Sequence, residues 1–449
     1  MTMNQRTNKP TLATRQLWYL TIGFLGAQGT LSMQTGNMSR IFQTLGADPT
    51  KLGYFFILPP LAGMLVQPLV GYLSDRSWFP KLGGRRLPYL ILGTIISVIA
   101  MVLLPNAGSL GFGYRSLAAL WFGAVSVFVM DCAANVNLSV YKMLIPDIVP
   151  KQQQSEAWDF QSITGALGNV LAFLFPFLLT VIGVANVAPQ GVVPASVQIS
   201  FYAAAVILLV STLFTLKKVH EYPPEVMASF TGHEVQRKRQ SLGQIIRKAP
   251  SQFWSCSLVM FFGMFALQYM WTYTPGVLAQ NIWHSTNPAS SGYQAAGNWF
   301  GVLQAIMAVA GIGAGIVISK LKLTKHRKPL FLVSSGLGGI GYLLLALGTT
   351  RLLTIIAFIL IGIQFVTIQV VVFSLFTNSL DGKNDGLYTG LFNVSICLPQ
   401  IVASLASFGL FNWVQHDMAS MLIIASGAVF VAGLCIYTVK DPLQRKAVG

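Results

Sequence analysis

One carboxyl side chain lies deep inside an apolar run of this 449-residue sequence. The chain has thirteen acids, and only Asp131, in Phe128-Val-Met-Asp131-Cys-Ala-Ala-Asn135, is far from any loop or run end. A carboxyl group buried in a membrane segment is costly and usually functional. Loss of hydration disfavours its charged form, so such a group can exchange a proton near neutral pH. The alternative is a protonated Asp131 whose hydrogen bonds tie two helices together.

Two further polar residues follow Asp131 at helical spacing. Asn135 is four residues on and Lys142 is eleven, which at about 100° per residue puts all three on one stripe of a helix. A rise of about 1.5 Å per residue separates Asp131 from Lys142 by about three turns, too far for a direct ion pair. Coupling between them would need a substrate, water or a conformational change. Alternatively, Lys142 extends to the membrane edge as a plain interfacial base.

A second group of charges occupies a short loop after another apolar run. The loop reads Gly71-Tyr-Leu-Ser-Asp75-Arg76 and then Gly83-Gly84-Arg85-Arg86. Asp75 can cap or pair with a neighbouring helix end, while the arginines can bind carboxylates or helix C-termini. We therefore expect this loop to act as a gate that holds one conformational state. The alternative is a basic anchor at the membrane surface.

Uncharged polar and aromatic residues within the apolar runs are further candidates for a solute site. The amides are Gln28, Gln34, Asn37, Asn169, Gln304, Gln364, Gln369, Asn393 and Gln400, and the aromatics are Tyr269, Trp271, Tyr273, Trp283 and Trp299. Each amide can face a cavity or make an interhelical hydrogen bond. Each aromatic can stack on a sugar ring or belong to an interfacial belt. The predicted substrate-binding set is Asp131, Asn135, Lys142, Asn169, Gln34, Asn393, Gln400, Tyr269 and Trp271.

The composition indicates the elements that must position these residues. Hydrophobic residues make up 54% of the chain and charged ones 9%, far below the roughly 25% charged share of soluble proteins. The apolar runs reach about twenty residues, enough to cross a bilayer as helices. Because lipid offers backbone amides no partner, the prediction is an all-α membrane protein. The first run is too long for a signal peptide and is expected to stay as the first span.

The apolar runs predict twelve transmembrane helices. They lie near 17–44, 52–73, 87–105, 116–146, 158–183, 197–216, 252–279, 295–319, 329–348, 352–379, 386–411 and 419–439. Weak similarity between Thr164-Gly165-Ala-Leu-Gly-Asn169-Val and Thr389-Gly390-Leu-Phe-Asn393-Val supports two related halves. The prediction is a six-helix bundle at 1–216, a cytoplasmic linker at 217–250 and a second six-helix bundle at 251–449. Secondary transporters are built from such halves, with the solute site between them.

The basic residues set the expected orientation. Of 29 lysines and arginines, only Arg40, Lys51, Arg115 and Arg351 fall on one side of the predicted topology, which leaves 25 on the other. This bias puts both termini in the cytoplasm. The formal charge of +16 sits in short loops without interleaved aromatics, so nucleic-acid binding is excluded. The bases of the 217–250 linker are those of a solvated segment touching anionic headgroups.

The sequence holds no motif for enzyme chemistry. There is no Walker loop, HExxH, GxSxG or carboxylate pair within the spans, and the four cysteines lack metal-ligand spacing. No enzyme activity, cofactor or metal is therefore expected, and any driving force must be an ion gradient. A polytopic membrane enzyme or sensor is a remote alternative.

Several separated segments resemble one known family. The residues that carry the resemblance are Phe42-Gln-Thr-Leu-Gly46, Gly63-Met-Leu-Val-Gln-Pro68-Leu-Val-Gly-Tyr-Leu-Ser-Asp75-Arg76, Asp131-Cys-Ala-Ala-Asn135, Gly168-Asn169-Val-Leu and Gly386-Leu-Tyr-Thr-Gly-Leu-Phe-Asn393-Val-Ser-Ile-Cys-Leu-Pro399-Gln400. They are similar to the sucrose/proton symporters of plants and their animal and bacterial relatives, a branch of the major facilitator superfamily. The 71–86 loop has that superfamily's pattern between its second and third spans.

The resemblance implies a role for Asp131 and a class of substrate. It implies that Asp131 is the acid that couples protons and binds sugar, in an importer of sucrose or of a maltose-type glucoside that works by alternating access. The implied partners are the disaccharide, protons and the bilayer, for a carrier that functions as a monomer in a bacterial inner membrane. Lys142 replaces an arginine of the plant proteins, and Phe265–Tyr273 lacks their charged seventh-span motif. An exporter, an antiporter or an uncoupled facilitator is the alternative.

Overall fold

The computed structural model describes residues 9–231, 249–320, 326–379 and 391–440. Within these residues the chain is helical, apart from loops and one isolated antiparallel bridge between Phe79 and Gly84. That bridge closes a tight turn in the 71–86 loop, where Gly83 adopts a φ of 84°. Residues with a side chain avoid this left-handed region, so glycine suits the turn.

Seven helices and a short eighth come from the first part of the chain. They are α1 (Thr14–Thr44), α2 (Leu52–Phe56), α3 (Leu58–Ser74), α4 (Leu87–Leu103), α5 (Leu117–Ile148), α6 (Gln154–Val181), α7 (Ala195–Lys218) and α8 (Pro224–Thr231). A 3-10 turn, α2 and α3 together form one span from Pro49 to Ser74. The eight-residue α8 lies inside the predicted linker, where the polar sequence gave no expectation of a helix.

The second part of the chain supplies the remaining helices. They are α10 (Ser251–Trp283), α11 (Ser291–Lys320), α12 (Arg327–Leu347), α13 (Arg351–Thr367), α14 (Phe373–Thr377), α16 (Val394–Trp413) and α17 (Met418–Cys435). A π-helical segment, Ile368–Val372, joins α13 to α14 within one span. The expected eleventh span began at residue 386, but residues 380–390 lie outside the described ones.

The prediction of twelve transmembrane helices is confirmed. Eleven helical spans among the described residues are long and apolar enough to cross a membrane, and α1 makes twelve. The 31-residue α1 falls below that hydropathy level because protein surrounds it. It packs against α5, α6 and α7 and also reaches α10 and α11. A helix with little surface toward lipid can carry many polar and small residues, as α1 does.

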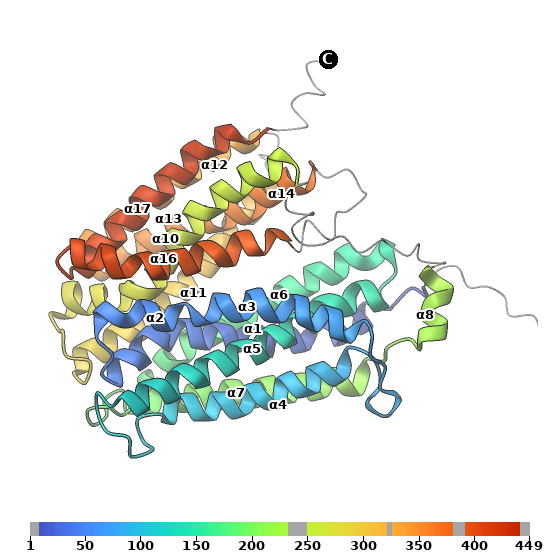
Figure 1. Cartoon of the computed structure of the whole chain (residues 1–449), viewed down its shortest axis with the longest axis horizontal. Helices are drawn as coiled ribbons and strands as arrows, with labels where there is room; N and C mark the ends of the chain where they lie inside the picture. The colour runs from blue at the N-terminus through green and yellow to red at the C-terminus, as the bar shows by residue number, and fades with distance from the viewer. Residues whose placement is uncertain (1–8, 232–248, 321–325, 380–390, 441–449) are drawn as a thin grey trace, which may run out of the picture.

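Two hydrophobic cores divide the molecule. One consists of buried side chains between Leu17 and Val219, and the other of side chains between Phe253 and Val439. Helices α1, α2, α3 and α6 meet α10, α11 and α16 between them. In Figure 1 the two layers converge at the left and diverge toward the right. On the basis of these cores we propose the division at 1–216, 217–250 and 251–449.

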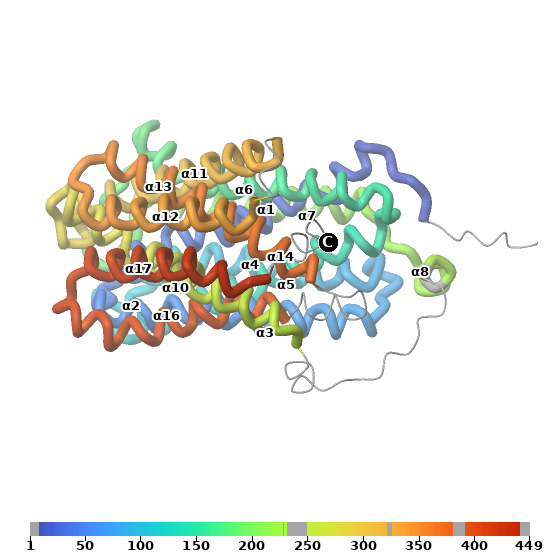
Figure 2. The backbone as a smooth tube through the Cα atoms, turned by 90° about the horizontal axis from the view of Figure 1, so that it is seen from above, coloured from blue at the N-terminus to red at the C-terminus, as the bar shows by residue number. Residues whose placement is uncertain are grey.

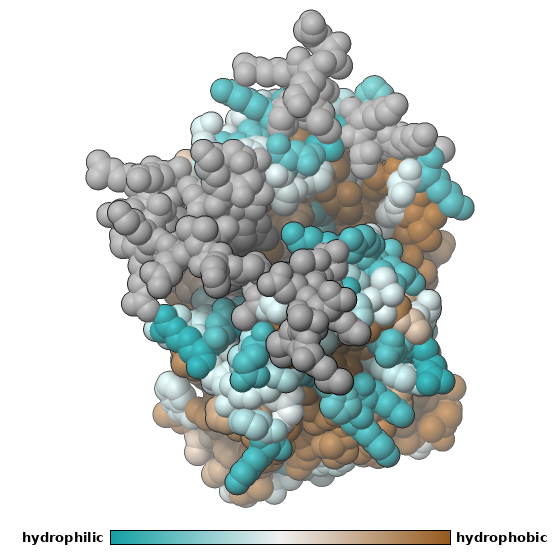
Figure 3. Space-filling model, turned by 90° about the vertical axis from the view of Figure 1, so that its right-hand side faces the viewer, coloured by the Kyte–Doolittle hydropathy of each residue, from teal (hydrophilic) through white to brown (hydrophobic). Residues whose placement is uncertain are grey.

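The two ends of the molecule differ, and each is named here after one residue. The Asp75 end, at the right of Figure 1, holds the 71–86 loop and α8. The Arg40 end, at the left, holds the 284–290 loop, where the halves converge. Figure 2 shows α8 set apart from the long helices at the Asp75 end. Hydrophilic side chains are concentrated on this face in Figure 3, and hydrophobic ones predominate at its lower edge.

Close packing of α1 on α6 holds the first bundle together. A Cβ atom on Gly168 would lie 2.2 Å from the backbone oxygen of Leu25 and 3.2 Å from the nitrogen of Gly29. Backbone atoms cannot move away as a flexible side chain can, so this contact requires glycine.

We therefore predict that Gly168→Ala destabilises the protein by about 1–3 kcal/mol, the usual cost of overpacking. Thermal unfolding of the purified protein in detergent should show a melting temperature several degrees lower. Gly313→Ala is the matched control, because a Cβ there meets nothing within 4 Å. An unchanged melting temperature for Gly168→Ala would show that α1 and α6 can separate freely.

Candidate functional site

A cavity of about 260 Å³ lies between the two halves, at the level of Asp131. Its walls come from α1, α2, α3 and α5 of the first half and from α10 and α16 of the second. Six of the nine predicted substrate-binding residues line it: Gln34, Asp131, Asn135, Trp271, Asn393 and Gln400. The cavity therefore gathers polar side chains from helices that are distant in sequence.

Among the described residues that line this cavity, Asp131 alone carries a carboxyl group, and it is 1% exposed. The side-chain nitrogen of Gln34 donates a hydrogen bond of 2.6 Å to its Oδ2. Among the described residues no lysine or arginine lies within ion-pairing distance of it. The second polar atom of the amide, Gln34 Oε1, is buried and has no hydrogen-bond partner.

A chain of amides leads from Asp131 across the interface between the halves. Asn135 donates to the backbone oxygen of Asp131 at 2.9 Å and accepts a 2.8 Å hydrogen bond from Gln67. Gln67 in turn accepts a longer hydrogen bond of 3.4 Å from Asn393, which belongs to the second half. Each amide carries both donors and acceptors, as the hydroxyl groups of a sugar require.

The second half contributes an aromatic ring and two more amides. Trp271 lines the cavity and packs against both hydrophobic cores. Gln268 donates to the backbone oxygen of Phe56 at 2.8 Å and to Ser404 at 2.9 Å, so it ties α10 to the first half. Within the described part of the chain, the Gln400 amide has a single 3.9 Å contact, with the sulfur of Met264, which leaves it available to a solute.

Three predicted site residues lie away from the cavity. Tyr269 is 1% exposed and packs in the second core between Phe265 and Tyr273. Asn169 accepts a 2.5 Å hydrogen bond from Ser32, which joins α6 to α1. Lys142 is exposed and makes no described contact with Asp131. A direct ion pair between the two is absent from the described residues, as their helical separation predicts.

The halves are joined at the Arg40 end by a buried guanidinium group. Arg40 is 1% exposed and donates to Gln294 at 2.5 Å, Asn298 at 2.7 Å and Asn186 at 2.7 Å. Its three partners are amide oxygens, two of them from α11 of the second half. Arg40 was counted with Lys51, Arg115 and Arg351 on one side of the predicted topology, and its side chain is enclosed between the halves near the end of α1.

Along α1, the closure at Arg40 separates two cavities. Gln34 lines the central cavity, and Gln43, about 13 Å further along the helix axis, lines a larger cavity of about 650 Å³. Between them Ser39 donates to the backbone oxygen of Thr272 at 2.8 Å, next to the Arg40 cluster. This arrangement is closed between the centre and the Arg40 end.

The 71–86 loop forms an ion-pair network at the opposite end. Arg86 reaches Asp75 at 2.5 Å and Asp147 at 2.9 Å, and Arg85 reaches Asp147 at 2.7 Å. The network joins the end of α3, the start of α4 and the end of α5. Arg76 lies over the ring of Tyr72 at 3.7 Å. A Cβ on Gly71 would meet nothing within 4 Å, so that glycine is not required by packing.

Glu221 completes this network and was not expected from the sequence. Its carboxylate accepts hydrogen bonds from the backbone N–H groups of Arg85, Arg86 and Leu87 at 3.1, 2.8 and 2.8 Å. A carboxylate is favoured at a helix N-terminus because the first N–H groups lack partners within the helix. Burial raises the pKa of Glu221, and the three hydrogen bonds oppose that rise. The chain after α7 is thereby fastened to α4.

Sequence reasoning missed four residues of these sites: Gln67, Gln268, Asp147 and Glu221. Asp147 and Glu221 were taken for ordinary acids of loops and span ends, although the adjacent bases Arg85 and Arg86 were expected to bind carboxylates. Helical spacing offers one signal for Gln67, which lies four residues after the cavity-lining Gly63. Gln268 could not be identified in this way, because the sequence does not show which residues of the two halves are in contact.

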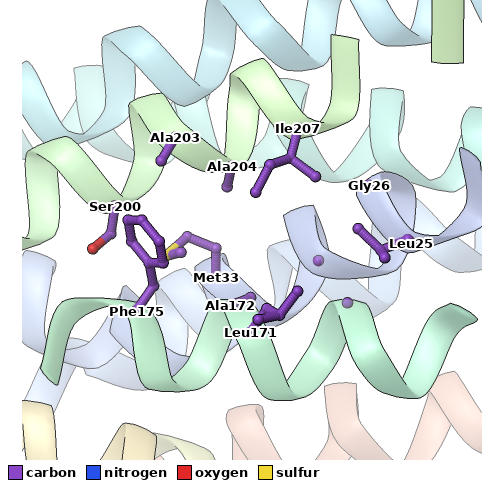
Figure 4. Close-up of a pocket in the computed structure, with 12 residues that line it drawn as sticks. Leu25, Gly26, Met33, Leu171, Ala172, Phe175, Ser200, Ala203, Ala204 and Ile207 are labelled. Carbon is purple, nitrogen blue, oxygen red and sulfur yellow. The ribbon is translucent and has the colours of Figure 1, made fainter. Parts of the chain in front are cut away.

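A second, apolar cavity differs from the central one in the chemistry of its lining. The pocket in Figure 4 lies between α1, α6 and α7, has a volume of about 20 Å³, and is lined by residues such as Leu25, Met33, Phe175 and Ile207. Ser200 is its one hydroxyl-bearing residue, and that hydroxyl donates to the backbone oxygen of Ser196. This small apolar space lacks the chemistry to bind a polar solute.

Comparison with known proteins finds similar carriers. The chain is 26% identical over 281 residues to the general alpha-glucoside permease of Schizosaccharomyces pombe, which covers 60% of this chain and 49% of that protein. The match therefore spans about half the length of that relative. The chain is also 23% identical over 459 residues to the sucrose transport protein SUC4 of Arabidopsis thaliana, covering 91% of this chain and 86% of that one.

Solved structures show the same fold. A D-xylose-proton symporter superposes with a TM-score of 0.70 at 15% identity, covering 95% of this chain and 98% of that one. The xylose transporter XylE from E. coli, in an inward open conformation, gives a TM-score of 0.63 at 13% identity, covering 95% and 94%. The model of the Major Facilitator Superfamily matches residues 20–404. With a match of that extent and twelve helices around a central cavity, the chain belongs to the Major Facilitator Superfamily.

Proposed function

We propose that this protein is a proton-coupled symporter that imports a disaccharide, sucrose or a maltose-type glucoside, by alternating access. The observation that carries the proposal is the central cavity, in which one buried carboxyl group, several amides and a tryptophan ring face each other between the halves. In this proposal Asp131 couples the proton and binds the sugar. Gln34, Asn135, Asn393, Gln400 and Trp271 bind the sugar with it.

Sugar recognition is supported by the chemistry of the lining and by the relatives. Amides donate and accept hydrogen bonds, and an indole ring offers the apolar face on which a pyranose can stack. The relatives named above are a general alpha-glucoside permease and a sucrose transport protein. A volume of about 260 Å³ is just below the about 300–1,000 Å³ of typical small-molecule sites. Binding a disaccharide would therefore require the halves to separate slightly.

Proton coupling is supported by the surroundings of Asp131. Because no cation pairs with Asp131 among the described residues, protonation would break no ion pair. The donor of Gln34 faces the carboxylate, and the acceptor of Gln34 is buried without a partner. Rotation of this amide by half a turn would present the acceptor to a protonated Asp131. Gln34 would then match either protonation state with one hydrogen bond.

Alternating access is supported by the closure at the Arg40 end. The closed layer there separates the central cavity from the larger one, and opening it would require the amides of α11 to leave Arg40. We propose that the Arg40 end faces outward and that the Asp75 end, with both termini, faces the cytoplasm of a bacterial cell. The 71–86 loop is proposed as the gate at that inner end, in a carrier that works as a monomer.

Asp131→Asn should abolish sugar accumulation driven by an imposed proton gradient in proteoliposomes, because the variant has no group to protonate. Counterflow of labelled sugar should persist, since an asparagine can still hydrogen bond the sugar. Asp159→Asn makes the same change at an exposed acid and should leave accumulation intact. Undiminished accumulation in Asp131→Asn would exclude Asp131 as the coupling acid.

The choice of sugar can be tested on the purified protein by thermal stabilisation. A ligand that binds only the folded state raises its stability by an amount set by concentration and Kd. Disaccharides should stabilise the protein more than monosaccharides, and Trp271→Ala should reduce that difference. Equal stabilisation by all sugars, or by none, would argue against a disaccharide site.

Arg40→Met should shift the protein toward the state that is open at the Arg40 end. The change leaves the buried amide oxygens of Gln294 and Asn298 without the Arg40 donor, at about 1–3 kcal/mol for each unsatisfied group, and opening gives them water. The half-buried Asn186 keeps its hydrogen bond from Ser196. A cysteine at Thr44, in a background whose four native cysteines are alanines, should react severalfold faster with an impermeant maleimide. Arg115→Met is the control, because this exposed arginine lies at the same end, over the ring of Tyr114, and has no bond to a described residue of the second half. Equal labelling rates would show that Arg40 does not hold the halves together.

Asp75→Asn should lower the transport rate severalfold while KM changes less than about twofold. Asp75 is distant from the cavity and holds Arg86 at the end of α3, so its loss should affect the conformational change and not sugar binding. Initial-rate kinetics in proteoliposomes would measure both constants, with Lys81→Gln as the control in the same loop. Parallel losses of rate and affinity would contradict a gating role.

A further inference from the structure

Two basic side chains share one aromatic ring at the Asp75 end of α1 and α7. The guanidinium carbon of Arg15 lies 5.4 Å from the centre of the Tyr19 ring, and the Lys218 ammonium lies 5.7 Å from it. Both basic residues are exposed. Among the described residues neither has a carboxylate within 4 Å. This leaves two positive charges close together with their anion-binding capacity unused.

An apolar crevice lies along the same pair of helices. Its volume is about 460 Å³, and its lining comprises Ile22, Val206, Ile207, Val210, Ser211 and Phe214. Val206 and Val210 are 59% and 60% exposed, on a helix that spans the membrane. Phe214 packs edge-on against Tyr19 at 5.2 Å between ring centres. The crevice therefore begins where the two basic residues meet.

Helical spacing makes the basic pair and the crevice one continuous surface. Arg15, Tyr19 and Ile22 are spaced by four and three residues, so they share a face of α1. Lys218, Phe214 and Val210 are each four residues apart, so they share a face of the antiparallel α7. Ile207 also lines the neighbouring pocket in Figure 4, which extends the apolar surface toward the middle of the membrane.

We propose that this surface, made of Arg15, Tyr19, Lys218 and the α1/α7 crevice, is a binding site for an anionic phospholipid. The phosphate group would lie between the two bases at the Asp75 end, and an acyl chain would occupy the crevice. Charge complementarity favours an anionic headgroup over a zwitterionic one. The length and position of the crevice favour a membrane lipid over a soluble anion, since a free phosphate would leave it empty.

The site is separate from the proposed transport path. None of its residues lines the central cavity, and its crevice lies between the half-buried Ile22 of α1 and the exposed apolar side chains of α7. A bound lipid would nevertheless contact α1, the helix that carries Gln34 and Arg40. Lipid binding can be measured without any transport assay, so its failure would say nothing about the transported solute.

The test is native mass spectrometry of the delipidated full-length protein with phosphatidylglycerol and phosphatidylethanolamine of identical chains. The wild type should bind phosphatidylglycerol more tightly, and Arg15→Gln with Lys218→Gln should weaken that binding by about tenfold or more. Lys151→Gln with Lys320→Gln removes two exposed bases at the same end and should change it little. Val210→Trp, which fills the crevice, should weaken binding of both lipids.

Three results would overturn the proposal. One is equal affinity of the wild type for the two lipids, and another is equal loss in the two double variants, since both would indicate only diffuse attraction to basic residues. The third is displacement of the lipid by inorganic phosphate together with unchanged binding in Val210→Trp, which would identify an anion site that makes no use of the crevice. Circular dichroism of each variant would verify that its helices are retained.

Discussion

A bilayer offers no hydrogen-bond partner to a polar side chain, and this constraint governs where every polar residue of the protein lies. Asp131 is held by Gln34, and the two arginines before α4 are held by Asp147 and Asp75. Where pairing inside one half is complete, the helices form a stable bundle. Around the central cavity, Gln34 and Gln400 retain unused hydrogen-bonding capacity, as do the buried amides of Asn137, Gln304 and Gln364 elsewhere in the described bundles. What sets the proposed solute site apart is that its unused amide groups line a cavity that a ligand can occupy.

Most of the fold could be predicted because each membrane span must be long and apolar enough to cross a bilayer as a helix. Length and hydropathy located the helices to within a few residues, apart from the eleventh, whose expected start falls outside the described residues. Helix α1 differs from the other spans because other helices cover most of its surface. Its mean hydropathy alone would not identify it as a membrane span. Its recognition depended on the length of the run and on the basic residues before it. The short α8 escaped prediction because eight residues are too few to span a membrane and it lies in a linker that was read as solvated.

The candidate site could be predicted only in part. Asp131 was identifiable because a lone acid in an apolar run is costly, and helical spacing linked Asn135 to it. The partner on another helix, Gln34, was one amide among many, and only the packing of α1 on α5 selects it. Tyr269 looked as suitable as Trp271, yet a difference of two residues turns one into the core and the other toward the cavity. The type of a residue suggests what chemistry it can do, whereas the direction in which its side chain points depends on tertiary contacts.

The chemistry of the Arg40 cluster has a consequence for how the carrier responds to its surroundings. Its three partners are amides, which neither gain nor lose charge as the medium acidifies. A closure built on carboxylates would loosen in acid, at the very moment when a steep proton gradient is most useful. If the Arg40 end faces outward as proposed, its uncharged acceptors make the closure there indifferent to external acidity. Acid on that side would then act on the proposed proton site at Asp131, and the Arg40 cluster would hold the halves together equally well at any pH of the medium.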